Sequence, residues 1–110
     1  MKNEIRELAE ISEAEEHFDN IVWYHRHKVL CALIDNGEMS VVQDCAMTGR
    51  DPSLVSESRW MEAQKIAAEI EAKIDDYELN PCSDFRWGMI NGKLSTLRWV
   101  LGEEWDNLDT

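Results

Sequence analysis

Apolar residues recur with helical spacing along most of the chain. In the segment 53–78 they are separated alternately by three and four positions, at Trp60, Ala63, Ala67, Ile70, Ile74 and Tyr77. The segment 84–101 repeats this spacing at Trp87, Ile90, Leu94, Leu97 and Leu101. Such spacing forms one apolar stripe along an α-helix. No strand-like alternation bounded by hairpin turns is evident.

The first third of the chain, from Met1 to Asn36, contains neither glycine nor proline. We predict a helix over 3–17 and a second over 20–35, with Asp19 as the N-cap of the second. A single helix over 3–35 is the alternative. Asn36 and Gly37 form a typical helix end.

Local signals place the remaining helices. Ser40 and Gln43 match a capping box, which predicts a short helix over 41–48. Asp51-Pro52 suits the start of the helix over 53–78, and Ser83 suits the N-cap of the helix over 84–101. The sequence therefore predicts an all-α fold for residues 1–110, a single helical domain. We expect a small antiparallel bundle of four main helices plus a short connector helix.

The chain is strongly acidic, with 23 acidic and 11 basic residues among 110 and a formal net charge of −12. Such a charge disfavours direct binding to nucleic acid or to an anionic membrane surface. The longest apolar run, 29–34, is too short to cross a bilayer. The three cysteines, which form no CxxC pair, fit a reducing cytoplasm. We expect no cofactor and no metal site.

Acidic residues recur every third position near the N-terminus, at Glu4, Glu7, Glu10, Glu13, Glu16 and Asp19. In an α-helix such a row winds slowly around the axis, by about 60° per step. A row of carboxylates on a rigid helix can imitate a phosphate backbone and bind a basic protein; the commoner alternative is a solvated helix face. Trp105, in the acidic tail, either folds back onto the helices or binds a partner, because tryptophan is enriched among binding hot spots.

The cluster WYHRHK at 23–28 stands out in so acidic a chain. One hypothesis is a pocket in which Tyr24, His25 and Arg26 meet an anionic or protein ligand. The alternative is a partly exposed helix turn whose bases pair with neighbouring carboxylates. His25 and His27 lie about 200° apart around a helix, so they cannot share a metal ion.

Two motifs partly match sequence patterns of nucleotide-binding proteins. Glu13-x-x-Glu16 matches the first acidic pair of all-α, magnesium-dependent nucleotide pyrophosphatases, but Glu103-x-x-Asp106, the other such pair, lies far away. GMINGKLS at 88–95 falls one position short of a P-loop. Because the apolar stripe runs through it, we interpret it as helix, with Gly88 and Gly92 allowing close approach of another helix and Lys93 pointing away from the stripe.

The C-terminal stretch DFRWGMINGKLSTLRWVLGEEWDNLDT resembles the ending of a group of small acidic bacterial and phage-type proteins, with WYHRHK belonging to the same pattern. The resemblance carries no known activity, so no functional residue can be transferred. It implies a phage or mobile-element accessory protein. We therefore expect a non-enzymatic binding protein that blocks the nucleic-acid-binding surface of a protein partner, as anti-defence (anti-CRISPR-like) inhibitors do. A homodimeric accessory protein and, behind it, the nucleotide pyrophosphatase are the alternatives.

Overall fold

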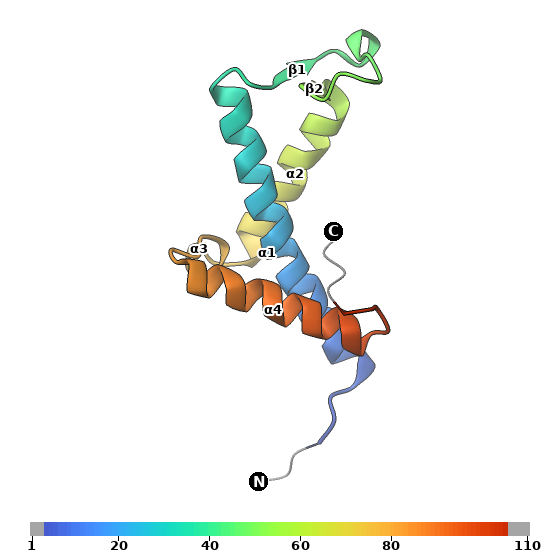
Figure 1. Cartoon of the computed structure of the whole chain (residues 1–110), viewed down its shortest axis with the longest axis vertical. Helices are drawn as coiled ribbons and strands as arrows, with labels where there is room; N and C mark the ends of the chain where they lie inside the picture. The colour runs from blue at the N-terminus through green and yellow to red at the C-terminus, as the bar shows by residue number, and fades with distance from the viewer. Residues whose placement is uncertain (1–3, 106–110) are drawn as a thin grey trace. The chain divides into compact units, whose positions relative to one another are not determined.

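The computed structural model describes residues 4–105, which are mostly helical. Its elements are α1 (Leu8–Asp35), β1 (Ser40–Val42), the 3₁₀ helix η1 (Asp44–Ala46), β2 (Leu54–Ser56), α2 (Glu57–Lys73), α3 (Asp76–Leu79) and α4 (Asp84–Val100) (Figure 1). The chain divides into two compact units, one formed by the residues up to Val22 together with those from Asn80, the other by Trp23–Leu79. Each unit is described by itself, and one domain over 1–110 stays a prediction.

The first two predicted helices are one helix, α1, so the predicted break at 18–19 is wrong. The Asp19 carboxylate does not cap a backbone N–H group; it accepts a hydrogen bond from the Arg98 guanidinium at 2.6 Å. The helix also begins at Leu8 rather than at residue 3, and Ile5 and Leu8 are exposed. A first turn without packing partners gains too little to offset its ordering entropy.

The predicted helix over 41–48 is also wrong. β1 and β2 form a parallel two-stranded sheet, in which Val41 pairs with Val55. Gln43 precedes η1 and makes no side-chain capping bond. Valine favours strands because its branched side chain packs well on a pleated surface, and the pairing of Val41 with Val55 prevails over the apparent capping box.

The helix predicted from residue 53 begins later, at Glu57. Asp51 instead holds a turn, accepting hydrogen bonds from the backbone N–H and the hydroxyl of Ser53 at 2.9 and 2.6 Å. Ser56 is the N-cap of α2, and its hydroxyl accepts from the backbone N–H of Arg59. The Asp44 carboxylate accepts from the backbone N–H of Ser58 at 3.0 Å. Hydrogen bonds from Ser58 hold the pKa of the Asp44 carboxyl below its usual value.

Ser83 and Gly37 mark helix ends as predicted, and Gly102 marks a third. Ser83 caps α4 by accepting from the backbone N–H of Arg86 at 3.2 Å. Gly37 and Gly102 follow α1 and α4 with φ angles of +85° and +107°, a conformation that glycine adopts without a Cβ penalty.

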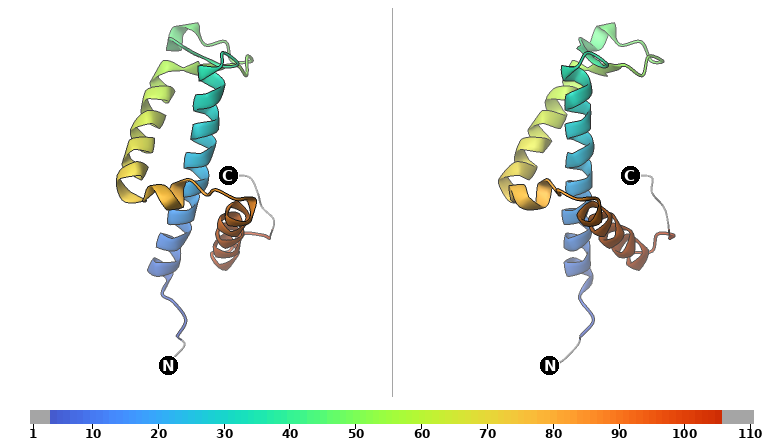
Figure 2. Two further views of the ribbon diagram at one scale, coloured as in Figure 1. Left: turned by 90° about the vertical axis from the view of Figure 1, so that its left-hand side faces the viewer. Right: turned by 60° about the vertical axis from the view of Figure 1, so that its left-hand side comes forward.

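In the second unit the C-terminal part of α1 and α2 run in opposite directions, with β1 and β2 in the segment that joins them (Figures 1 and 2). Its buried apolar residues include Ala67, Ile70 and Ile74, as the stripe predicted. In the first unit α4 packs against the N-terminal part of α1, and Ile90 and Leu94 are buried. Tyr77, by contrast, lies in α3 and is exposed.

The largely helical fold class is therefore confirmed, with a small parallel sheet added to it. The predicted set of four main helices and a connector is wrong in its details, because α1 replaces two helices and α3 has only 4 residues. An antiparallel bundle of the whole chain stays a prediction.

Candidate functional site

Five of the predicted partner-binding glutamates are exposed. Glu4 and Glu7 precede α1, while Glu10, Glu13 and Glu16 lie on it. Arg6, the one base among the seven acids of residues 4–19, lies 3.0 Å from the Glu10 carboxylate. The carboxylates thus line the outside of the first turns of α1 and the segment before it, and a basic surface could reach them.

Asp19 has a different environment from the other members of this row. Its carboxylate and that of Glu15 flank the Arg98 guanidinium, at 2.6 and 3.5 Å. Glu103 approaches the same guanidinium at 3.7 Å. Asp19 therefore joins α1 to α4 within the first unit, and the exposed part of the predicted row consists of the five glutamates.

The residues of the predicted pocket, Tyr24, His25 and Arg26, do not share one environment. Tyr24 is buried, whereas His25 and Arg26 are exposed. Consecutive residues of a helix point about 100° apart, so three in a row cannot converge on one ligand from the same face.

A polar cluster surrounds the buried side chain of His27. The ring of His27 stacks between the rings of Trp23 and Trp60, with centroid distances of 5.1 and 5.2 Å. Its Nε2 atom lies 2.8 Å from the Gln64 Oε1 atom and 3.6 Å from the Cys31 sulfur. A buried histidine with a satisfied ring nitrogen, held between two indoles, indicates a structural role in joining α1 to α2.

Tyr24 makes a second polar contact between the same helices. Its hydroxyl donates to the Glu71 carboxylate at 2.8 Å. Burial, followed by this hydrogen bond and the nearby negative charges of Glu71 and Asp76, raises the pKa of Tyr24 to about 12. Sequence reasoning missed this cluster, although Tyr24, His27 and Cys31 have the three- and four-residue spacing of one helix face.

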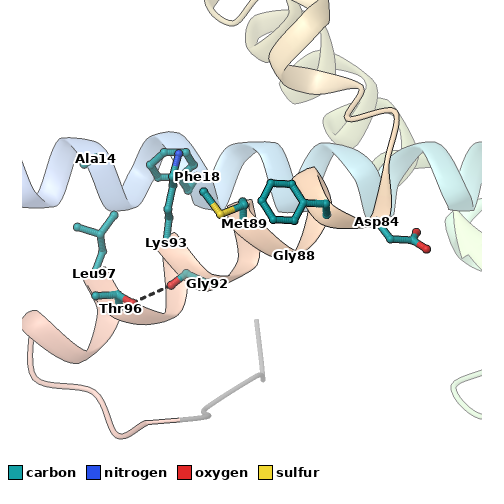
Figure 3. Close-up of a pocket in the computed structure, with 10 residues that line it drawn as sticks. Ala14, Phe18, Asp84, Gly88, Met89, Gly92, Lys93, Thr96 and Leu97 are labelled. Carbon is teal, nitrogen blue, oxygen red and sulfur yellow. Dashed lines mark hydrogen bonds between the residues drawn. The ribbon is translucent and has the colours of Figure 1, made fainter.

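The stretch GMINGKLS is helical, as predicted, and lies inside α4. Close packing of another helix on its glycines is not found: Gly88 and Gly92 are exposed, and a Cβ atom at either would meet nothing within 4 Å. They line an open groove of about 880 Å³ whose other residues include Ala14 and Phe18 of α1 (Figure 3).

Lys93 does not extend freely from α4. Its ammonium group lies 5.4 Å from the centroid of the Phe18 ring, a cation–π geometry across the same groove. The groove is otherwise largely apolar, because Phe85, Met89 and Leu97 also line it. Such a lining suits an apolar helix face better than a phosphate.

Trp105 folds back onto the C-terminal end of α4. Its ring stacks on that of Trp99, with centroids 4.8 Å apart and planes 13° apart. The residue still exposes 52% of its surface. Intramolecular stacking and an accessible indole therefore coexist at this position.

Among residues 4–105 no three His, Cys, Asp or Glu side chains are grouped as metal ligands would be. Glu13 and Glu16 are exposed on α1, and Asp106 of the second acidic pair lies outside the described residues. Within that same range no helix is long and apolar enough to cross a membrane. No family model, no curated protein and no solved structure matches the chain.

Proposed function

We propose that this chain is a non-enzymatic acidic binding protein of phage or mobile-element type. It binds a basic, nucleic-acid-binding protein stoichiometrically and occupies the surface that would otherwise hold nucleic acid. An anti-defence inhibitor, anti-CRISPR-like in its mode of action, is the biological role that suits this activity best.

The observation that carries the proposal is the exposure of Glu4, Glu7, Glu10, Glu13 and Glu16. In α1 a step of three residues advances about 4.5 Å along the axis. Glu10, Glu13 and Glu16 therefore follow one another at short, regular intervals on α1, as phosphates do along a nucleic-acid strand, and Glu4 and Glu7 extend the row into the segment before the helix. Asp19, the last acid of the row, pairs with Arg98 and does not belong to its solvated part.

The remainder of the chain supports the same interpretation. A net charge of −12 attracts a basic surface over a distance and accelerates encounter with it. Two polar groups of the second unit, Tyr24 and His27, are buried and hydrogen-bonded to Glu71 and Gln64. They hold α1 and α2 together, which suits a scaffold that presents a surface.

A displacement experiment tests the proposal. Immobilised duplex DNA is loaded with the proteins of a bacterial lysate at low salt and washed with the purified chain. The test variant carries glutamine at Glu4, Glu7, Glu10, Glu13 and Glu16 and keeps Asp19, because Arg98 needs that carboxylate. A matched control neutralises five other exposed acids: Asp35, Glu38, Glu57, Glu62 and Glu69.

The wild type and the matched control should release a discrete set of proteins, and the test variant should release far less of the same set. Release that is equal for all three chains would show that the N-terminal row has no special role. No release by any of them would refute competition with nucleic acid altogether.

A further inference from the structure

The C-terminal end of α4 carries two exposed, stacked indole rings. The helix closes at Gly102, whose φ is +107°. The backbone N–H of Gly102 donates to the Trp99 carbonyl at 3.0 Å, and that of Glu103 donates to the Arg98 carbonyl at 2.9 Å. The chain therefore turns back on the last turn of α4, where the ring of Trp105 stacks on that of Trp99. We call Trp99 and Trp105, which expose 48% and 52% of their surface, the indole pair.

The surroundings of the indole pair favour a cation as ligand. The face of an indole ring is negative and attracts positive charge. Glu103 and Glu104, both exposed, lie between the two tryptophans in the chain. The C-terminal end of a helix dipole also attracts a cation within the last turn. The base of this turn, Arg98, already pairs with Asp19 and Glu15 of α1, so its charge is compensated.

The geometry of the two rings indicates which cation fits. Their planes lie 13° apart and their centroids 4.8 Å apart, so the pair is a flat stack. A quaternary ammonium group is bound by several rings that surround it, as in the aromatic cages for methylated lysine, and a flat stack does not surround a ligand. The guanidinium group of arginine is planar, stacks on aromatic faces and donates hydrogen bonds to a carboxylate. A flat stack beside exposed carboxylates therefore suits arginine.

We propose that Trp105 and Glu104 bind an arginine side chain of the basic partner. The guanidinium group lies flat on the face of Trp105 that is turned away from Trp99, and the Glu104 carboxylate accepts hydrogen bonds from it. We assign this role to Glu104 because Glu103 already lies 3.7 Å from the Arg98 guanidinium. That the arginine belongs to a partner rests on the proposed function, in which the partner is a basic protein. Tryptophan and arginine are both enriched among binding hot spots.

A peptide titration followed by nuclear magnetic resonance tests the site. The probe is tri-arginine with blocked termini, and tri-lysine in the same form is the control, because it has the same charge but no planar group. A ¹⁵N spectrum shows one indole N–H signal for each of the five tryptophans, and Trp99→Phe and Trp105→Leu assign two of them. Tri-arginine should shift these two signals most and should bind at least about threefold more tightly than tri-lysine.

Matched variants separate the ring from the charge. Trp105→Leu keeps an apolar side chain without the ring and should weaken tri-arginine binding at least about threefold. Phe85→Leu is the control, because Phe85 is an exposed ring at the other end of α4, where the helix dipole disfavours a cation. Glu104→Gln should weaken binding about twofold, whereas Glu69→Gln removes the same charge from α2 and should not. Circular dichroism establishes that each variant is folded.

Three results would overturn the site: equal affinities for the two peptides, unchanged signals of Trp99 and Trp105, or tri-arginine binding that Trp105→Leu leaves intact. In the displacement of proteins from DNA, Trp105→Leu should release less protein than Phe85→Leu does. Equal release would overturn the assignment of the arginine to the partner. A wild type that releases nothing would refute the proposed function and with it the partner's arginine, whereas the peptide titration decides on the guanidinium site alone.

Discussion

The Arg98 guanidinium donates a 2.6 Å hydrogen bond to the Asp19 carboxylate, from 79 positions further along the chain. Because Arg98 is largely buried and also approaches Glu15, it compensates two neighbouring carboxylates at once. This contact joins α4 to the N-terminal part of α1. It distinguishes Asp19 and Glu15, which contact Arg98, from the exposed glutamates of the same helix.

Arg98→Ala should lower the free energy of unfolding by about 1–2 kcal/mol, because it leaves Asp19 and Glu15 close together without a countercharge. Urea denaturation at neutral pH measures the change. Arg6→Ala is the control, since Arg6 pairs with Glu10 on an exposed helix surface and such pairs contribute less than about 0.5 kcal/mol. Equal losses for the two variants would contradict a structural role for Arg98.

Tyr24→Phe removes the hydrogen bond to Glu71 and should lower the free energy of unfolding by about 1 kcal/mol at neutral pH. The pKa of Tyr24 is raised to about 12 from 10.0, so the folded state holds the proton more tightly than the unfolded state does. This stabilisation is intact below pH 10 and is lost as the pH rises toward about 12.

Urea denaturation at pH 7 and pH 11 tests this pH dependence of the free energy of unfolding. Part of the stability difference between wild type and Tyr24→Phe should disappear at pH 11. A gap for Tyr24→Phe that widens at pH 11 would contradict the assignment.

His27→Ala should be among the most destabilising single substitutions, at about 2–3 kcal/mol, because it leaves a cavity between Trp23 and Trp60 and removes the hydrogen bond to Gln64. Thermal denaturation measures the loss, and tryptophan fluorescence should change because both indoles lose their stacked ring. Val29→Ala, on an exposed face of the same helix, is the control. A loss no larger than that of Val29→Ala would show that the buried stack adds nothing to stability.

Gly88→Ala should stabilise the isolated chain by up to about 1 kcal/mol, because alanine favours a helix and the added methyl group meets no atom. Gly37→Ala should destabilise it by about 1 kcal/mol, since its φ of +85° disfavours an L-residue. Denaturation at high dilution, where association is weakest, measures both changes. Destabilisation by Gly88→Ala would mean that the methyl group meets a neighbour within a single copy.

Sequence reasoning located best those features that depend on a few adjacent residues. The caps at Ser83, Gly37 and Gly102 are local, since each depends on the conformation or side chain of one residue and on N–H groups within one turn. The apolar stripes that bury Ile70 and Leu94 are likewise set by the helical period.

Features that depend on remote partners were not predictable in this way. Asp19 looked like an N-cap because nothing near it in sequence indicates Arg98. Val41 and Val55 form a strand pair only because each has the other as a partner, and a parallel pair has no hairpin turn to announce it.

The candidate sites likewise divide into features that depend on adjacent residues and features that depend on remote ones. A helical wheel alone separates Tyr24 from His25 and groups it with His27, so the different environments of Tyr24 and His25 followed from the sequence. The open space beside Gly88 did not, because spacing predicts that a helix can approach and cannot say whether that helix belongs to the same chain.

Displacement of labelled DNA is the sharpest test of competition between the N-terminal glutamates and nucleic acid. A nucleic-acid-binding protein released from the DNA matrix is bound to a short fluorescent duplex, and the chain is added while fluorescence anisotropy is followed. We expect the anisotropy to fall to the value of free DNA, with the fall complete near one chain per DNA-binding site. Replacement of the five N-terminal glutamates by glutamine should shift the midpoint at least about tenfold, or about 1.4 kcal/mol, and the matched five-acid control should not shift it. Anisotropy that rises, as in a ternary complex, or equal midpoints for the two variants would contradict the claim.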